Sequence, residues 1–119
     1  MKLAITSQDV GMESAVDPRF GRAKYFVVVD LDTNEAETVS NAVNLNAAQG
    51  AGIQAAKTVI DLGVKVLITG HVGPKAFAAL QAGGVAVYPV AGGTVIEALE
   101  DLGAGSLQAM AAADVEGHW

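Results

Sequence analysis

The residues of this chain most able to do chemistry are cations gathered in one short run. Arg19, Arg22 and Lys24 are three of the seven Lys and Arg residues, although the formal net charge is −6. Arginine presents a planar fork of N–H donors that suits oxyanions, and Gly21 lets backbone approach a bound group closely. Residues 19–24, here called the cationic loop, therefore predict an anion site. The same charges would also serve simply to hydrate a loop and to pair with Asp17.

Two glycine-bearing turns are expected near this loop. Residues 69–74 and 89–94, here the first and second glycine turns, each follow an expected strand and precede an expected helix. Ligands of open α/β sheets gather at the carboxyl ends of strands, and helix N-termini there add N–H donors for an anion. Glycines in such turns can also serve chain geometry alone. The candidate anion-binding residues are Ser7, Arg19, Phe20, Gly21, Arg22, Gly70, Gly73, Gly92 and Gly93.

His71, within the first glycine turn, is the residue best placed to ligate a transition metal. A histidine at this position would equally serve as a hydrogen-bonding group at the start of a helix. His118 lies in an expected tail, and Met12 would more commonly fill a gap between side chains, so both are weaker candidates.

The sequence contains no constellation typical of an enzyme. It has no HExxH or GxSxG motif, and neither glycine turn matches a phosphate-loop or dinucleotide fingerprint. Two-metal nuclease chemistry needs clustered carboxylates, one of them in the middle of the first strand, yet residues 2–6 contain no acid. We therefore expect a protein that is not an enzyme and takes no nucleotide cofactor.

Composition restricts the partners and the compartment. The chain has 119 residues and no cysteine, so disulfides and thiolate metal sites are excluded. Basic residues outside the cationic loop are scattered, which argues against nucleic-acid binding. The apolar stretch at residues 3–5 is too short for a signal peptide or a membrane span. We expect a cytoplasmic protein with no membrane partner.

Hydrophobic patterning predicts the elements that must position these residues. Apolar and β-branched stretches predict strands over residues 2–6, 24–31, 36–40, 64–69 and 85–88. Helical spacing of apolar residues predicts helices over 50–62, 74–81 and 94–102. Residues 7–22 are expected to form a long loop, and long loops in compact domains are often functional.

This order of elements predicts an α/β fold of the ribonuclease H-like type. An antiparallel β-β-β meander would be followed by α-β-α-β-α, which gives a mixed five-stranded sheet covered by helices. A flavodoxin-like fold would instead alternate strands and helices from its start. We expect one domain over residues 1–110 and a flexible tail over 111–119.

A set of motifs in a fixed order extends over about residues 1–109. It comprises the first strand and residues 20–26, 50–53, 70–76, 84–88 and 97–107. This set resembles the dinitrogenase iron–molybdenum cofactor biosynthesis family. The resemblance implies a ribonuclease H-like fold without nuclease activity. It also implies a carrier for an iron–sulfur or iron–molybdenum cofactor precursor, with a donor or acceptor protein as partner.

One position departs from the family. Members often have His directly before the Phe-Gly-Arg motif, where this chain has Arg19. A potential metal ligand is thereby replaced by a cation. Such clusters are large anions already saturated with sulfide, so Arg19 and Arg22 would neutralise charge and His71 would add one exchangeable bond.

Two other functions stay open on the residues alone. The same loop and turns would suit a small-anion or nucleotide-phosphate sensing module that needs no metal. Alternatively, the chain would be a metal-free interaction domain, such as a homodimer that buries the expected edge strand 36–40.

Overall fold

Three strands are followed by alternating helices and strands, as the hydrophobic pattern predicts, in the described residues, 1–42 and 50–111, of the computed structural model. The strands are β1 (Lys2–Ser7), β2 (Tyr25–Asp30), β3 (Glu35–Ser40), β4 (Val64–Thr69) and β5 (Ala86–Pro89). The helices are α2 (Ala51–Asp61), α3 (Pro74–Ala82) and α4 (Val95–Gly103), with a short 3-10 helix, η1 (Phe20–Arg22). The expected tail lies outside the described residues, apart from Ala111, and so does His118.

The strands form one mixed sheet in the order β3-β2-β1-β4-β5. β2 pairs antiparallel with both β1 and β3, while β1–β4 and β4–β5 are parallel pairs. The β2–β3 turn is tight enough to place Asn34 at a φ of 62°, a left-handed conformation that asparagine tolerates. The prediction of a mixed five-stranded α/β sheet is confirmed.

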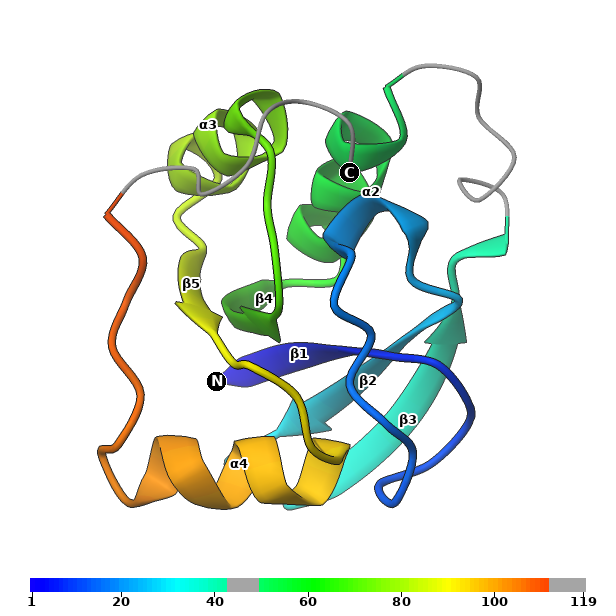
Figure 1. The fold of residues 1–119 in the computed structure, drawn as a ribbon, viewed down its shortest axis with the longest axis vertical. Coiled ribbons are helices and arrows are strands. Elements are labelled where there is room, and N and C mark those ends of the chain that lie inside the picture. The colour runs from blue at the N-terminus through cyan, green and yellow to red at the C-terminus, as the bar shows by residue number, and fades with distance from the viewer. Residues whose placement is uncertain (43–49, 112–119) are drawn as a thin grey trace.

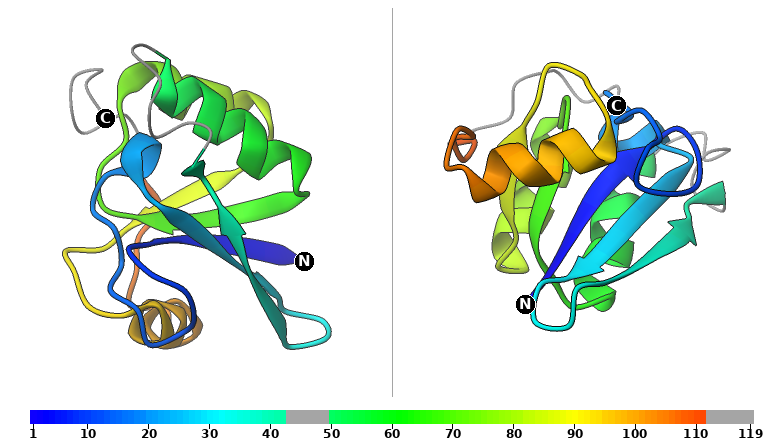
Figure 2. Two further views of the ribbon diagram at one scale, coloured as in Figure 1. Left: turned by 90° about the vertical axis from the view of Figure 1, so that its right-hand side faces the viewer. Right: turned by 90° about the horizontal axis from the view of Figure 1, so that it is seen from below.

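Helices cover both faces of the sheet, as Figures 1 and 2 show, with α2 and α3 on one side and α4 on the other. Central strands covered on both faces are apolar on both faces, and Leu3, Ala4 and Ile5 of β1 are fully buried. Phe20 of η1 joins the core on the α2–α3 side. Val16 of the long loop joins the core on the α4 side.

The two edges of the sheet differ. The chain after α4 runs along β5, where the Met110 N–H donates to the Val87 carbonyl at 2.7 Å. Leu107 packs on the α4 side of the sheet and Met110 on the other side. β3 forms the opposite edge, as expected of residues 36–40, and no other described strand pairs with its outer side. None of the described helices is long and apolar enough to cross a membrane.

Candidate anion site at the carboxyl ends of the strands

The long loop after β1 folds back over the edge of the sheet. Ser7 pairs with Val16 in an antiparallel bridge, and the Gln8 N–H donates to the Ala15 carbonyl at 2.9 Å. The Asp17 N–H then donates to the Thr6 carbonyl at 2.9 Å. This pairing of residues 7–17 places the cationic loop next to the carboxyl ends of β1 and β4.

The cationic loop and the first glycine turn lie side by side. Arg19 and His71 form a parallel bridge, in which the His71 N–H donates to the Pro18 carbonyl at 2.7 Å and the Phe20 N–H donates to the His71 carbonyl at 3.2 Å. Gly70 permits this approach, because a Cβ there would lie 2.5 Å from the Pro18 carbonyl oxygen. The backbone therefore brings two predicted parts of the site, distant in sequence, into direct contact.

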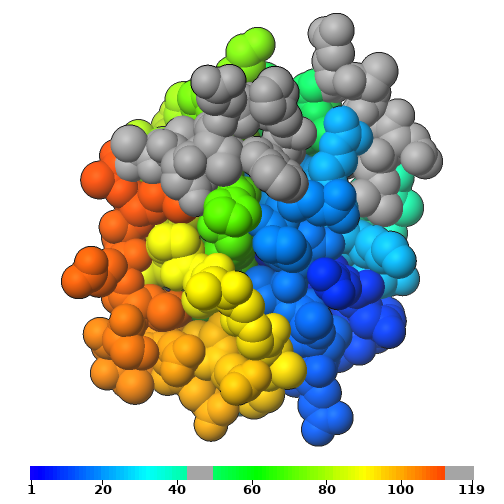
Figure 3. All heavy atoms as spheres, in the orientation of Figure 1, coloured from blue at the N-terminus to red at the C-terminus, as the bar shows by residue number. Residues whose placement is uncertain are grey.

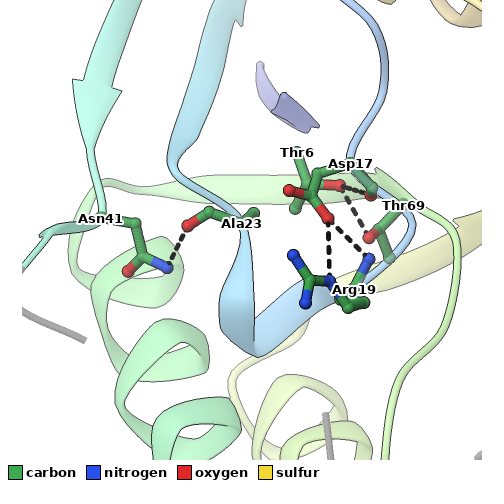
Figure 4. Close-up of polar contacts among 6 residues, drawn as sticks. All are labelled: Thr6, Asp17, Arg19, Ala23, Asn41 and Thr69. Atoms are coloured by element: carbon green, nitrogen blue, oxygen red, sulfur yellow. Dashed lines mark hydrogen bonds and ion pairs between the residues drawn. The ribbon is translucent and has the colours of Figure 1, made fainter. Parts of the chain in front are cut away.

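Buried polar side chains hold this junction together (Figure 4). The Thr6 hydroxyl lies 2.8 Å from the Asp17 carbonyl oxygen and 2.7 Å from the Thr69 hydroxyl. Since a hydroxyl has one proton, Thr6 donates to one of these groups, and when that is the carbonyl, Thr69 donates to Thr6. All three residues are buried. Thr69 is the last residue of β4, and Thr6 is the next-to-last residue of the neighbouring parallel strand β1.

Asp17 supports Arg19 in two ways. One carboxylate oxygen, Oδ1, accepts a hydrogen bond from the Arg19 backbone N–H at 2.9 Å and lies 3.7 Å from the Arg19 Nε. The Asp17 side chain is 3% exposed, whereas that of Arg19 is 49% exposed. The arginine thus presents half of its side chain to solvent above a buried acid.

Asn41 fastens the far end of the cationic loop. Its side-chain amide donates to the Ala23 carbonyl at 2.8 Å (Figure 4). Its backbone N–H donates to the Lys24 carbonyl, also at 2.8 Å. Asn41 is itself 1% exposed. The cationic loop is therefore pinned at both ends by buried polar residues.

The predicted site residues differ in how far their side chains are exposed to solvent. Arg19, Lys24 and His71 are exposed, and Arg22 is half-buried. Phe20 is fully buried, with its ring centroid 6.1 Å from that of Phe26. Gly21, Gly70 and Gly73 are buried, and so is Ser7, whose hydroxyl donates to the Asp9 carbonyl at 3.0 Å. Phe20 and Ser7 thus anchor the loop and present no side chain to solvent.

The second glycine turn offers fewer donors than expected. The N–H groups of Val95 and Ile96, at the start of α4, donate to loop carbonyls at 2.9 and 2.8 Å. The Glu97 N–H donates to the Thr94 hydroxyl, and the Glu97 carboxylate accepts from the Thr94 N–H in a capping box. The expectation that this helix start offers N–H groups to an anion is therefore not met, because the chain itself accepts them. Gly93 has a φ of 90°, a left-handed conformation that favours glycine, and the predicted contact of Gly92 and Gly93 with an anion stays a prediction.

The helix that follows the first glycine turn, α3, differs from α4 at its N-terminus. α3 begins at Pro74 after an extended Gly73, and among the described residues no side chain makes a capping hydrogen bond at its N-terminus. Lys75, in its first turn, is exposed. On one face of the molecule the first glycine turn (green) lies between the long loop (blue) and the segment after β5 (yellow), as Figure 3 shows. The positive features thus concentrate where the cationic loop meets the start of α3.

The described residues contain no group of at least three His, Cys, Asp or Glu side chains that could hold a metal ion. His71 alone would give a bare ion a single bond. A hollow does exist at the far end of the sheet, but its charged lining consists of Lys2 and three acids, Asp30, Glu35 and Glu37, so that it is negative overall. That lining would repel an anion.

Residues 1–105 match the dinitrogenase iron-molybdenum cofactor family. The chain belongs to this family. Among solved structures similar to it, the apo form of the orange protein from Desulfovibrio gigas is 43% identical, with 96% of both chains covered and a TM-score of 0.93. A Thermotoga protein proposed to be a NifB protein is 36% identical over 98% of both chains, with a TM-score of 0.85. An uncharacterized Methanocaldococcus jannaschii protein is 29% identical over 91 residues, 74% of this chain and 73% of the relative.

Within this family member, sequence reasoning missed the residues that hold the site. Thr6, Thr69 and Asn41 carry no motif of their own, and Asp17 stood out only as an ion-pair partner. One signal was available. Thr6 and Thr69 lie within one residue of the carboxyl ends of two apolar strands, and threonines so placed on adjacent parallel strands can bond to each other.

Proposed function

We propose that this protein binds and carries an anionic iron–sulfur or iron–molybdenum cluster without catalysing a reaction. The observation that carries the proposal is the backbone pairing of Arg19 with His71. It joins a cation and a possible metal ligand, both exposed, at the carboxyl edge of the sheet. Membership of the family supports an iron–molybdenum cargo. The orange protein was described in its apo form, a term for a protein without its bound group, which supports a binding role.

The residues of the site suit a cargo that brings its own ligands. Arg19, Arg22 and Lys24 neutralise part of the cluster charge, and the uncapped start of α3 adds a favourable dipole. His71 supplies one exchangeable bond to a metal of the cluster. Because the chain has no thiolate, the hold stays weak enough for the cluster to pass to an acceptor protein.

We also propose that the fold is ribonuclease H-like. The strand order is β3-β2-β1-β4-β5, and β2 runs in the direction opposite to the other four strands. This arrangement supports the assignment. A nuclease of this type needs an acid within the first strand, and β1 has none. The fold would then serve as a scaffold for the carrier, with donor and acceptor proteins meeting it in the cytoplasm.

An anaerobic titration with isolated iron–molybdenum cofactor tests the carrier proposal. Visible absorption and gel filtration should show the cofactor co-migrating at one cluster per chain or per dimer. Arg19→Gln and His71→Ala should each weaken this binding. Lys57→Gln removes an exposed cation of α2 and is the matched control, which should bind as the unmodified protein does.

Three outcomes would contradict the carrier proposal or its site. Unchanged affinity in an Arg19→Gln, His71→Ala double variant would contradict the proposed site. If no cofactor co-migrates and the protein instead binds inorganic phosphate or a nucleotide, the small-anion sensing function replaces the carrier. A dimer that binds neither probe would favour the interaction domain, with β3 as the open edge.

A further inference from the structure

A buried acid lies directly beneath the cation of the proposed site. Asp17 is 2% exposed. Burying a carboxylate is unfavourable unless hydrogen bonds and an opposite charge compensate it. The Arg19 N–H and guanidinium both face the Asp17 Oδ1, at 2.9 Å and at 3.7 Å from Nε.

The position of Asp17 does not depend on the Arg19 side chain. Its backbone N–H donates to the Thr6 carbonyl, and its carbonyl oxygen lies 2.8 Å from the Thr6 hydroxyl. These bonds fix Asp17 to the end of β1. The acid is therefore held in place by contacts that do not involve the Arg19 guanidinium.

The guanidinium is held more loosely than the backbone. A separation of 3.7 Å between Nε and Oδ1 is too long for a good hydrogen bond, so charge attraction is the main link. The Arg19 side chain is 49% exposed, which leaves donors for a group arriving from solvent. The arginine can thus face the acid below and an anion above.

We infer that Asp17 is an internal counter-anion that competes with the cargo for Arg19 and so keeps cargo binding reversible. The inference rests on the proposed function and concerns how that site releases its ligand. Without cargo, Asp17 neutralises the guanidinium. When cargo binds, the guanidinium is shared between two negative groups, which weakens its grip on each. On release, Arg19 returns to Asp17 and needs no other partner.

The Asp17→Asn substitution removes the negative charge of Asp17 and tests the effect of that charge alone. Asparagine has the same size, and its Oδ1 can still accept from the Arg19 N–H, so the loop geometry is kept. We expect this variant to bind isolated iron–molybdenum cofactor about three- to tenfold more tightly. The cofactor should also dissociate more slowly, measured as the fraction still bound after timed anaerobic gel filtration. Asp61→Asn, which removes an exposed acid of α2, makes the same change in net charge and should bind as the unmodified protein does.

The Arg19→Gln background separates competition from simple repulsion. With Arg19 absent there is nothing to compete for, so adding Asp17→Asn should leave the affinity unchanged. An equal gain with and without Arg19 would overturn the inference, because the acid would then act on the cargo directly. Unchanged or weaker binding by Asp17→Asn in the presence of Arg19 would overturn it too.

Two further measurements keep the test decisive. Circular dichroism and urea unfolding establish that each variant is folded, and Asp17→Ser provides a second neutral side chain that can accept from the Arg19 N–H. Failure of the unmodified protein to bind cofactor would contradict the proposed function itself. Binding that requires Arg19 but ignores Asp17 would contradict only the competition.

Discussion

Gly70 and Pro18 lie so close together that a Cβ on Gly70 would be 2.5 Å from the Pro18 carbonyl oxygen and 2.6 Å from the Pro18 Cα. The nearest atoms belong to backbone, which cannot rotate away as a flexible side chain would. The first glycine turn and the residues leading into the cationic loop therefore behave as one packed unit. A change at Gly70 should be felt at Arg19 as well as in the stability of the fold.

Gly70→Ala should lower the free energy of unfolding by about 1–3 kcal/mol, because the added methyl group overpacks this contact. Urea unfolding monitored by circular dichroism measures the effect. Gly103→Ala, at the end of α4, is the matched control, because a Cβ there meets nothing within 4 Å. Equal stability of the two variants would show that the junction tolerates a side chain.

Thr6→Val should lower the free energy of unfolding by about 1–3 kcal/mol. The substitution keeps the shape of the side chain but removes the hydroxyl that contacts the Asp17 carbonyl and the Thr69 hydroxyl, and it leaves a buried acceptor without that contact. Thr58→Val is the control, because Thr58 is only half-buried and its hydroxyl donates to the Gln54 carbonyl, one turn back in the same helix α2, at 3.0 Å. Thermal or urea unfolding of both proteins should rank Thr58→Val as clearly the more stable.

The sequence predicted the sheet and its helices because both depend on hydrophobic period. β4 was predicted at its observed bounds, Val64–Thr69, and α4 differs from the predicted 94–102 by one residue at each end. Two predicted parts of the site, the cationic loop and the first glycine turn, meet in space. They do so because they follow the carboxyl ends of the neighbouring parallel strands β1 and β4.

Long-range pairing within loops is what sequence patterning could not supply. Nothing in the spacing of residues 7–22 shows that Ser14 and Met12 carbonyls would accept the first N–H groups of α4. The second glycine turn looked equivalent to the first for this reason. Likewise, the polar and glycine-containing sequence on either side of Phe20 does not reveal that its side chain is buried in the core while that of Arg19 is exposed.

Thr94→Ala should lower the free energy of unfolding by about 0.5–2 kcal/mol through loss of the helix cap. Cofactor affinity should stay unchanged, because the start of α4 is occupied by the chain's own carbonyls and by Thr94. Glu100→Gln, on the exposed side of α4, controls for changes elsewhere in the helix. A weaker affinity in folded Thr94→Ala would mean that the second glycine turn does contact the anion.

Phe20→Leu should separate anchoring from contact with the cargo. Phe20 is fully buried against Phe26, so a smaller side chain should lower the free energy of unfolding by about 1–2 kcal/mol. Phe77→Leu, in α3 at 6% exposure, removes a similar apolar volume from the same core and is expected to cost a comparable amount. Because leucine still holds η1 against the core and both rings are buried, both variants should bind cofactor as the unmodified protein does. If Phe20→Leu alone lost affinity under conditions where both variants are folded, the ring would have to contact the cargo, and η1 would have to open when the cargo binds.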